Sequence, residues 1–335
     1  EIAAYRESRD GQVLEEGINE AGAFAAWLAA ATSYSTHGLT LIPFYIFYSM
    51  FGFQRVGDLA WAAGDIQARG FLLGGTAGRT TLNGEGLQHQ DGHSHVLAST
   101  IPNCISYDPC YAYEVAVIIH EGLRRMVQEK ESVFFYLTVM NESYVQPAMP
   151  EGVQDGILKG MYHLRTLGDE EGIRVRLLGS GTILREVEAA AETLHERYGI
   201  TVDIFSVTSF VELGREAQDV ARWNLLNPSE QPRQSYVAEL LQGDAPVVAS
   251  SDYMKSVAGL IRSEIDAPYL VLGTDGFGRS DTREELRHFF EVDRRFVTLA
   301  ALKSLADAQK LPVETVRQAR DDLGIDPDKP NPRLV

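Results

Sequence analysis

The stretch 39-LTLIPFYIFY-48 decides the fold class, because it is almost continuously apolar and is bounded by Gly38 and Ser49. An uninterrupted apolar run of this length is typical of a strand that is buried on both faces of a parallel sheet. Residues 54–69 carry apolar side chains at helical spacing, which predicts a helix after this strand. The sequence FLLGG at 71–75 then predicts the next short strand.

The same alternation of strand and helix continues along the chain. Residues 111–128 are predicted to form a helix and residues 132–140 a strand. A second series follows, with a predicted helix at 185–199 and predicted strands at 175–179, 201–207, 245–250 and 269–273. Strands that alternate with helices imply parallel sheets, so we predict an α/β fold with two parallel-sheet domains.

The segment NESYVQPAMPEG, residues 141–152, separates the two series. It contains two prolines and shows little periodicity, so we place a domain connection near Pro150. The chain has 335 residues, of which 44% are hydrophobic, and can therefore bury two ordinary cores. We predict one domain at 1–150 and another at 151–335.

Composition argues against several classes of partner. The 30 basic and 47 acidic residues give a formal net charge of −17, which predicts no binding to nucleic acid or to an anionic membrane. The longest apolar run, residues 41–53, is shorter than the roughly 20 residues of a membrane-spanning helix. Cys104 and Cys110 match neither a zinc or redox motif nor a disulfide framework. We therefore expect a soluble, cytoplasmic protein with reduced thiols.

The stretch LNGEGLQHQDGHSH, residues 82–95, gathers acid–base side chains in a short space. They are Glu85, His89, Asp91, His93 and His95. A metal site, an acid–base cluster and a merely polar loop are all open interpretations. The interspersed glycines predict a loop, in which the H-x-x-x-H spacing does not place two imidazoles on one helical face. Imidazoles beside carboxylates suit proton transfer, so acid–base chemistry is favoured over metal binding.

Three other motifs have plain structural explanations. Glu20 begins an alanine-rich helix, where an acidic residue in the first turn favours the helix dipole. The segment GSGTILRE at 179–186 invites a dinucleotide-binding reading, but Leu184 replaces the third glycine of that motif, which favours a tight strand-to-helix turn. Asp281 and Glu284 are spaced as a helix capping box.

Several longer strings, taken together, identify a family. They are GINE (17–20), IPFYIFYSMFGFQRVGDLAWAAGD (42–65), GGTAGRTTLNGEGLQHQDGHSH (74–95), SVTSF (206–210), ASSDYMK (249–255) and GTDGFGRSDTREELRHFFEVD (273–293). The chain closely resembles, over essentially its whole length, the bacterial homodimeric pyruvate dehydrogenase E1 components. That family consists of transketolase-like thiamin diphosphate enzymes. The resemblance implies that 1–150 is a pyrimidine-binding domain without its first strand and helix, and that 151–335 is a transketolase-type C-terminal domain.

The resemblance also implies roles for particular residues. Glu20 would bond to N1′ of the cofactor pyrimidine, with Ile18 nearby, and Phe51 would stack on the pyrimidine ring. Tyr48 would lie close to the reacting substrate. Of the loop residues, His89 would hydrogen bond to substrate with Glu85 tuning it, and His95 aligns with a substrate-contacting histidine of transketolases. Asp91 and His93 would support this polar wall, and no residue of the chain is assigned to a metal.

The implied activity is oxidative decarboxylation of pyruvate on thiamin diphosphate, followed by transfer of the acetyl group to the lipoyl group of the E2 acetyltransferase. The G-D-G segment and following Asn-bearing run that hold Mg²⁺ and the diphosphate in the family do not occur in these residues. We therefore expect a part of a longer homodimeric protein, inactive by itself. Two alternatives remain, a transketolase-type ketol transferase and a non-catalytic assembly or dimerisation module.

Overall fold

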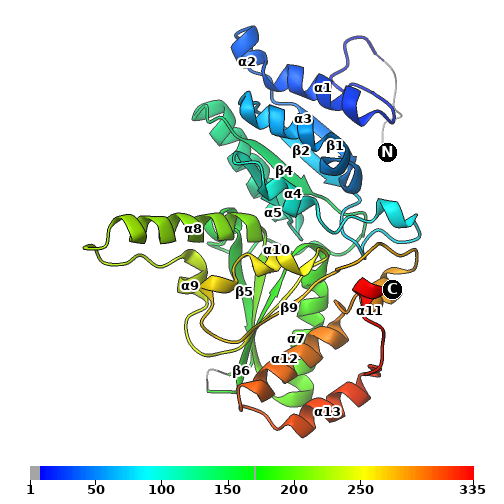
Figure 1. Ribbon diagram of the computed structural model, residues 1–335, viewed down its shortest axis with the longest axis vertical. Coiled ribbons are helices and arrows are strands. Elements are labelled where there is room, and N and C mark those ends of the chain that lie inside the picture. Colours follow the sequence, from blue (N-terminus) through cyan, green and yellow to red (C-terminus); the bar gives the residue numbers. More distant parts are fainter. Residues whose placement is uncertain (1–7, 170) are drawn as a thin grey trace.

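The fold contains two sheets, one above the other along the long axis of the molecule (Figure 1). The structure is a computed structural model that describes residues 8–169 and 171–335. The first sheet has the order β1-β2-β4-β3 and is parallel throughout, and the second has the order β5-β7-β6-β8-β9. The predicted α/β fold class is confirmed.

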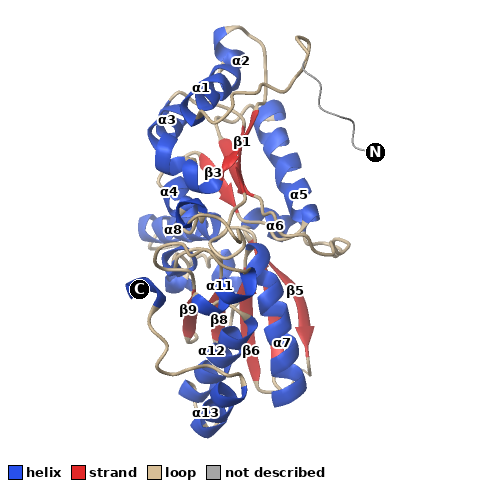
Figure 2. Cartoon of the chain, turned by 90° about the vertical axis from the view of Figure 1, so that its right-hand side faces the viewer, coloured by secondary structure: helices blue, strands red, loops and turns tan. Residues whose placement is uncertain are grey.

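The strands of the first sheet are β1 (Phe44–Tyr48), β2 (Phe71–Gly75), β3 (Cys104–Tyr107) and β4 (Phe134–Thr138). Its helices are α1 (Glu20–Ala31), α2 (Ser33–Thr36), α3 (Phe53–Asp65), α4 (Ser94–Ser99) and α5 (Ala112–Leu123), which continues as a π-helix over Arg124–Gln128. Buried residues of α1, α3 and α4 form the core on one face of the sheet, whereas α5 covers the other face (Figure 2). Short 3₁₀ turns occupy Ser49–Phe51 and Leu87–His89.

The strands of the second sheet are β5 (Met161–Leu167), β6 (Arg174–Gly179), β7 (Thr201–Val207), β8 (Val247–Ser250) and β9 (Tyr269–Leu272). One face packs against α7 (Leu184–Tyr198), α12 (Arg294–Asp307) and α13 (Val313–Asp322). The other packs against α8 (Phe210–Leu226), α9 (Tyr236–Leu240) and α10 (Lys255–Gly259). The remaining helices are α6 (Gln154–Lys159) and α11 (Arg283–Phe289), with 3₁₀ turns at Gly181–Ile183, Arg262–Glu264 and Pro332–Leu334.

Strand β1 corrects the prediction of a strand at 39–48 buried on both faces. The strand spans only Phe44–Tyr48 and lies at the edge of its sheet. Alternate side chains of a strand point to opposite faces. Phe47 is buried, but Phe44, Ile46 and Tyr48 on the opposite face are 46%, 68% and 43% exposed. The apolar run therefore indicated a strand here, but it predicted neither the shorter length of the strand nor the exposure of one of its faces.

Strand β5 was not predicted, and it pairs antiparallel with β7, so the second sheet is not wholly parallel. Polar residues such as His163 and Arg165 interrupt the strand because it lies at an edge with one side exposed. The predicted capping box of Asp281 and Glu284 is also wrong: Thr282 is the N-cap of α11 and accepts from the Glu285 amide. The domain boundary near Pro150 stays a prediction.

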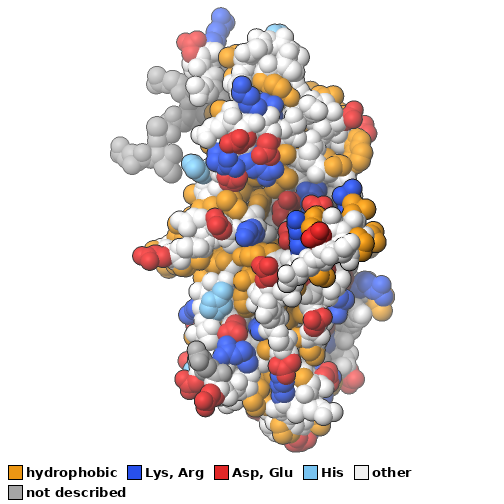
Figure 3. All heavy atoms as spheres, turned by 90° about the vertical axis from the view of Figure 1, so that its left-hand side faces the viewer, with side chains coloured by type: hydrophobic (Ala, Val, Ile, Leu, Met, Phe, Trp, Pro, Cys, Tyr) orange, Lys and Arg blue, Asp and Glu red, His pale blue; other side chains and the backbone are white. Residues whose placement is uncertain are grey.

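Charge is distributed without a single dominant patch on the face shown in Figure 3, where acidic and basic side chains are interspersed. Among the described residues, no helix has the length and apolar character needed to cross a membrane.

Candidate active site

The candidate site forms where β1 and β2 end. Parallel strands present their carboxyl ends at one edge of the sheet, which is where ligands bind in such folds. Tyr48 ends β1 and Phe51 follows in a 3₁₀ turn, while β2 leads into the loop that carries His89. The His89 ring centroid lies 5.6 Å from that of Tyr48 and 5.1 Å from that of Phe51, edge-on to the latter. The structure thus brings these three predicted residues together.

His89 has an unsatisfied nitrogen in this aromatic surrounding. Its Nδ1 atom is buried and has no hydrogen-bond partner among the described residues. The nearest carboxylate is that of Glu85, whose Oε2 atom lies 3.9 Å away, which is close enough for charge attraction but too long for a hydrogen bond. A buried polar atom of this kind is costly unless it is paired. The imidazole is therefore suited to receive a ligand.

Glu20 joins this group through a residue that the sequence did not single out. It begins α1, whose N-cap Asn19 accepts from the Gly22 amide. Its Oε1 atom accepts from Nη1 of Arg55 at 2.6 Å, and the Arg55 guanidinium lies 4.0 Å from the centre of the Phe51 ring. Arg55 is in the first turn of α3, where a cation opposes the helix dipole. A basic residue in the first turn of a predicted helix is thus a sequence signal that its side chain pairs with an acidic residue outside that helix.

Tyr45 lies next to Glu20, and burial and the Glu20 carboxylate both shift the pKa of its hydroxyl. Its hydroxyl donates to the main-chain oxygen of Glu20 at 3.5 Å. Burial, and secondarily the charge of Glu20, raise the pKa of Tyr45 to about 12, so it stays a neutral donor at ordinary pH. Ile18, by contrast, lies in the loop before α1 with its side chain 98% exposed. Its predicted contact with the cofactor stays a prediction.

Asp91 and His93 contact residues other than His89. Asp91 is fully buried just before α4, whose N-cap is His93, and its carboxylate accepts from the amides of His93 and Ser94, both at 2.9 Å, and from the Ser94 hydroxyl. The Nε2 atom of His93 lies 3.1 Å from the side-chain oxygen of Gln54. Their supporting roles stay predictions, but the contacts give Asp91 a clear structural role in starting α4.

His95 lies within α4 and is only 3% exposed. Its ring packs edge-on against Tyr253 and tilts against Tyr136, and its Nε2 atom lies 3.0 Å from the hydroxyl of Thr138. Burial lowers the pKa of His95 to about 4, against the opposing charge of Asp91. A neutral, enclosed imidazole suits the interior of the fold. The predicted contact of His95 with substrate stays a prediction.

Asp108 extends this buried network to the second sheet. Its carboxylate accepts from the Thr138 hydroxyl at 2.7 Å and from the Ser180 hydroxyl at 2.9 Å. Burial raises the pKa of Asp108 to about 7, even though both hydroxyls stabilise its charge. While Asp108 is ionised the single Thr138 proton goes to it, so Nε2 of His95 is the donor to Thr138. No sequence pattern had indicated Asp108.

Within 8–169 and 171–335, no group of three or more His, Cys, Asp or Glu side chains is placed to hold a metal ion.

The fold and the site together define a transketolase-like α/β protein. The chain superimposes on a solved transketolase from Leishmania mexicana with a TM-score of 0.63 and 16% identity, covering 86% of this chain and 37% of that one. Residues 160–293 match the family model of the transketolase-like TK C-terminal domain. Residues 1–147 match the model of the pyruvate dehydrogenase E1 component middle domain.

The particular family follows from the sequence relatives. The chain is 62% identical over 334 residues to the pyruvate dehydrogenase E1 component of Pseudomonas aeruginosa, and 61% identical over 337 residues to that of Escherichia coli K12. These alignments cover 99% and 100% of this chain but 38% of each relative. The chain belongs to the pyruvate dehydrogenase E1 component family and spans about two fifths of the length of these relatives.

Proposed function

We propose that the full-length protein carrying these residues decarboxylates pyruvate oxidatively with thiamin diphosphate and transfers the acetyl group to the lipoyl group of E2. One observation supports this above others. In a chain more than 60% identical to proteins named pyruvate dehydrogenase E1 component, Tyr48, Phe51 and His89 meet at one strand edge, joined through Arg55 to the predicted cofactor ligand Glu20.

The residues present suit the cofactor. Phe51 offers an aromatic ring for the pyrimidine to stack on, and Glu20 offers a carboxylate whose Oε1 atom holds Arg55 while Oε2 accepts no hydrogen bond from the described residues. The unpaired Nδ1 of His89 is a third group that awaits a partner. Thiamin diphosphate supplies the electron sink that decarboxylation of a 2-oxo acid needs. We propose that the groups holding Mg²⁺ and the diphosphate lie outside this chain.

His89 is the residue of this chain that we propose for acid–base work on the substrate. A histidine can donate and accept protons at neutral pH, and the aromatic rings of Tyr48 and Phe51 limit access of water to it. Glu85 is placed to orient the imidazole from 3.9 Å. Tyr48 is 43% exposed and can contact a small substrate beside His89. His95 and Asp91, enclosed as they are, would act at most through the packing of α4.

The proposed partners follow from the same family. We propose a cytoplasmic homodimer that acts with E2, with 1–150 as the pyrimidine-binding domain and 151–335 as the C-terminal domain. In support, large apolar side chains are exposed around the first sheet, and extended exposed apolar patches mark interaction surfaces. They are Val13, Leu14, Ile18, Leu39, Leu41, Phe44, Ile46 and Tyr48.

The decisive experiment uses the full-length protein with pyruvate, thiamin diphosphate and Mg²⁺, and measures release of CO₂ and acetylation of a lipoyl domain. Glu20→Gln should lower the rate by about 10²- to 10⁴-fold, the usual effect of losing a positioned acid–base group. The matched control is Glu230→Gln, at an exposed residue beyond the end of α8. Activity of the Glu20 variant within about twofold of the control would overturn the proposal. Ketol transfer between sugars without pyruvate turnover would favour the transferase alternative, and cofactor-independent assembly alone would favour the non-catalytic one.

A further inference from the structure

We propose that Asp252, in the second sheet's domain, is a positioning residue for the loop tip that carries His89. The inference rests on the proposed function, because it takes His89 as the substrate-contacting group. The loop in question runs from Gly78 to Gly92. Its tip, residues 83–89, is largely exposed, whereas Thr80, Thr81 and Leu82 on one side and Gln90, Asp91 and Gly92 on the other are buried.

Both carboxylate oxygens of Asp252 accept hydrogen bonds from the first side of the loop. Oδ1 accepts from the amide and hydroxyl of Thr80, at 2.8 and 2.7 Å, and Oδ2 accepts from the amide and hydroxyl of Thr81, at 3.1 and 2.6 Å. Asp252 is fully buried. Gly78 has φ +90, and a Cβ there would overlap the Asp252 carboxylate. Four charge-assisted bonds to two adjacent residues fix the chain direction just before the tip.

The second side of the loop is held from the same domain. The side chain of Gln90 donates to the Leu82 carbonyl at 2.7 Å, which closes the loop at its base, and accepts from the Arg279 amide at 2.6 Å. The Met254 amide, two residues after Asp252, donates to the Gly92 carbonyl at 2.8 Å. Both sides of the base are therefore attached to the second domain, although the loop begins and ends in the first.

The place of attachment lies where the strand order of the second sheet reverses. In the order β5-β7-β6-β8-β9, the chain leaves β6 for β7 on one side and later returns to β8 on the other. The crevice beyond two such strands is where doubly wound sheets bind ligands. Asp252 follows β8, and Thr182 follows β6 and lies 2.5 Å from the Thr81 hydroxyl. The loop of the first domain thus occupies the ligand position of the second.

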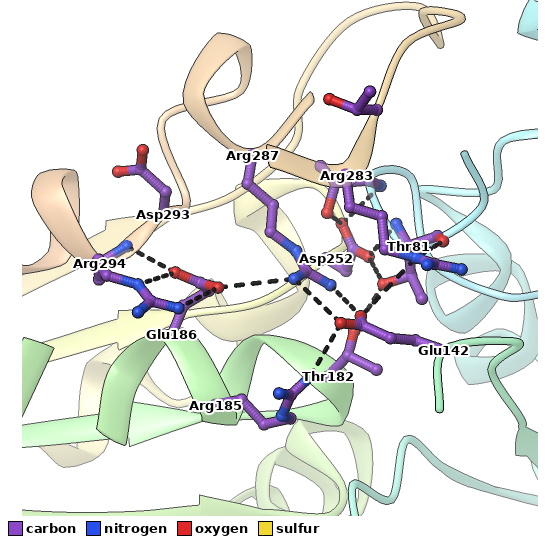
Figure 4. A network of polar contacts seen from close by, with 12 residues as sticks. Thr81, Glu142, Thr182, Arg185, Glu186, Asp252, Arg283, Arg287, Asp293 and Arg294 are labelled. Carbon is purple, nitrogen blue, oxygen red and sulfur yellow. Dashed lines mark hydrogen bonds and ion pairs between the residues drawn. The ribbon is translucent and has the colours of Figure 1, made fainter. Parts of the chain in front are cut away.

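Figure 4 shows this arrangement, with Thr81, Thr182 and Asp252 meeting beside the ion pair of Arg287 and Glu142. Arg283 also reaches the loop there, because its Nε atom donates to the Thr81 carbonyl at 2.7 Å. The loop and these side chains therefore meet at the ends of β6 and β8. We infer that one function of the second domain is to hold the His89 loop in place.

The test compares Asp252→Asn with Glu114→Gln in the full-length protein. Glu114 is a matched control, since it too is fully buried and accepts from two amides, those of Cys110 and Tyr111, and from two hydroxyls, those of Tyr162 and Ser206. Among the described residues, it makes no hydrogen bond to the loop. Both substitutions keep the side-chain shape and disrupt a similar set of bonds, so their general effect on folding is comparable.

The first measurement is amide hydrogen exchange over residues 83–89, which Asp252 does not contact directly. We expect exchange in the tip to rise by about tenfold or more in Asp252→Asn relative to Glu114→Gln, because charge-assisted bonds at the base are lost. The second measurement is kinetic: kcat/KM for pyruvate should fall by a similar factor, whereas the concentration of thiamin diphosphate required should not change, since Glu20 and Phe51 lie outside the loop.

Thr80→Val and Thr80→Ser provide a milder pair if Asp252→Asn does not fold. Valine removes one hydroxyl bond to Asp252, and serine restores it, so serine should rescue the loss. Unchanged exchange in the tip, relative to the Glu114 control, would show that Asp252 does not position it. Faster exchange with normal pyruvate kinetics would instead overturn the role of His89 in the proposed function, so the two failures are distinguishable.

Discussion

The Nη1 atom of Arg55 lies 2.6 Å from the Oε1 atom of Glu20, which connects the first turn of α3 to the first turn of α1. The arginine side chain is 49% exposed and the glutamate 20% exposed. An ion pair with this much solvent contact stabilises a fold by only about 0–1 kcal/mol. The pair is therefore better understood as a means of orienting the Glu20 carboxylate than as a source of stability.

Arg55→Met should consequently separate activity from stability. The free energy of unfolding should change by less than about 1 kcal/mol, because methionine keeps the apolar stem over Phe51 and only an exposed pair is lost. Pyruvate turnover should fall by about tenfold or more, since the carboxylate loses its fixed orientation. Urea unfolding of the chain and turnover by the full-length protein measure the two effects. A large loss of stability with unchanged turnover would show that Arg55 is structural.

Substitution of Glu114, unlike that of Arg55, should lower the free energy of unfolding substantially. Its buried carboxylate accepts from the amides of Cys110 and Tyr111, just before α5, and from the hydroxyl of Ser206 in β7, so it joins the two sheets' domains. Glu114→Gln puts an amide NH₂ among four donors and should lower the free energy of unfolding by about 3 kcal/mol. Chemical denaturation measures this loss. Glu230→Gln, at an exposed position, should change it by less than about 0.5 kcal/mol.

Asp108 predicts a pH dependence of folding stability. Its pKa of about 7 in the folded protein exceeds the ordinary value near 3.8, so the folded state binds the proton more tightly. Stability should therefore be greatest below about pH 4 as far as Asp108 is concerned, and it should fall as pH rises from there to about 7. Over this range Asp108 should change the free energy of unfolding by at most about 4 kcal/mol, at roughly 1.36 kcal/mol per unit of pKa difference.

Protonation of His95 has the opposite effect on the free energy of unfolding over part of this pH range. Its pKa of about 4 lies below the ordinary value of 6.5, so it destabilises the fold as pH falls from about 6.5 to 4. Comparing the protein with Asp108→Asn isolates the aspartate, because Asn can accept from Thr138 and donate to Ser180. The difference in unfolding free energy should favour the variant increasingly from pH 4 to 7. A difference that did not vary with pH would contradict the raised pKa of Asp108.

Much of the fold could be predicted because its inner strands are apolar and its helices periodic. Strand β7 spans the predicted residues 201–207, and α7 lies within one residue of the predicted 185–199. The edge strands were harder, because β5 is interrupted by polar residues and the outer face of β1 is uncovered although apolar. Apolar composition indicates a tendency to be buried, whereas actual burial depends on which other helices and strands pack against that face.

The site was predictable only in part, for a related reason. Tyr48, Phe51 and His89, which the family resemblance singled out, lie together because Tyr48 ends β1, Phe51 follows it and His89 follows the neighbouring β2, but their roles stay predictions. Arg55, Asp108 and Asp252 were not predicted. Asp252 lies 172 residues from Thr80 in the sequence, and nothing near it indicates that partner. Long-range polar contacts of this kind depend on how two domains meet, which no local pattern encodes.

Two substitutions in the full-length protein should separate the proposed roles of Glu20 and His89. Glu20→Gln keeps the side-chain shape but weakens the carboxylate's interaction with N1′ of the cofactor, so it should slow exchange of the cofactor C2 proton for deuterium, which needs no substrate. His89→Ala should leave that exchange within about twofold, because His89 lies on a loop and is proposed to contact the substrate. Pyruvate turnover should fall in both variants, by about 10²- to 10⁴-fold for a lost acid–base group. Glu230→Gln, at an exposed position beyond the end of α8, is the control and should keep both activities. If His89→Ala lost C2 exchange as severely as Glu20→Gln, the loop would be shaping the cofactor pocket, and the assignment of His89 to the substrate would be wrong.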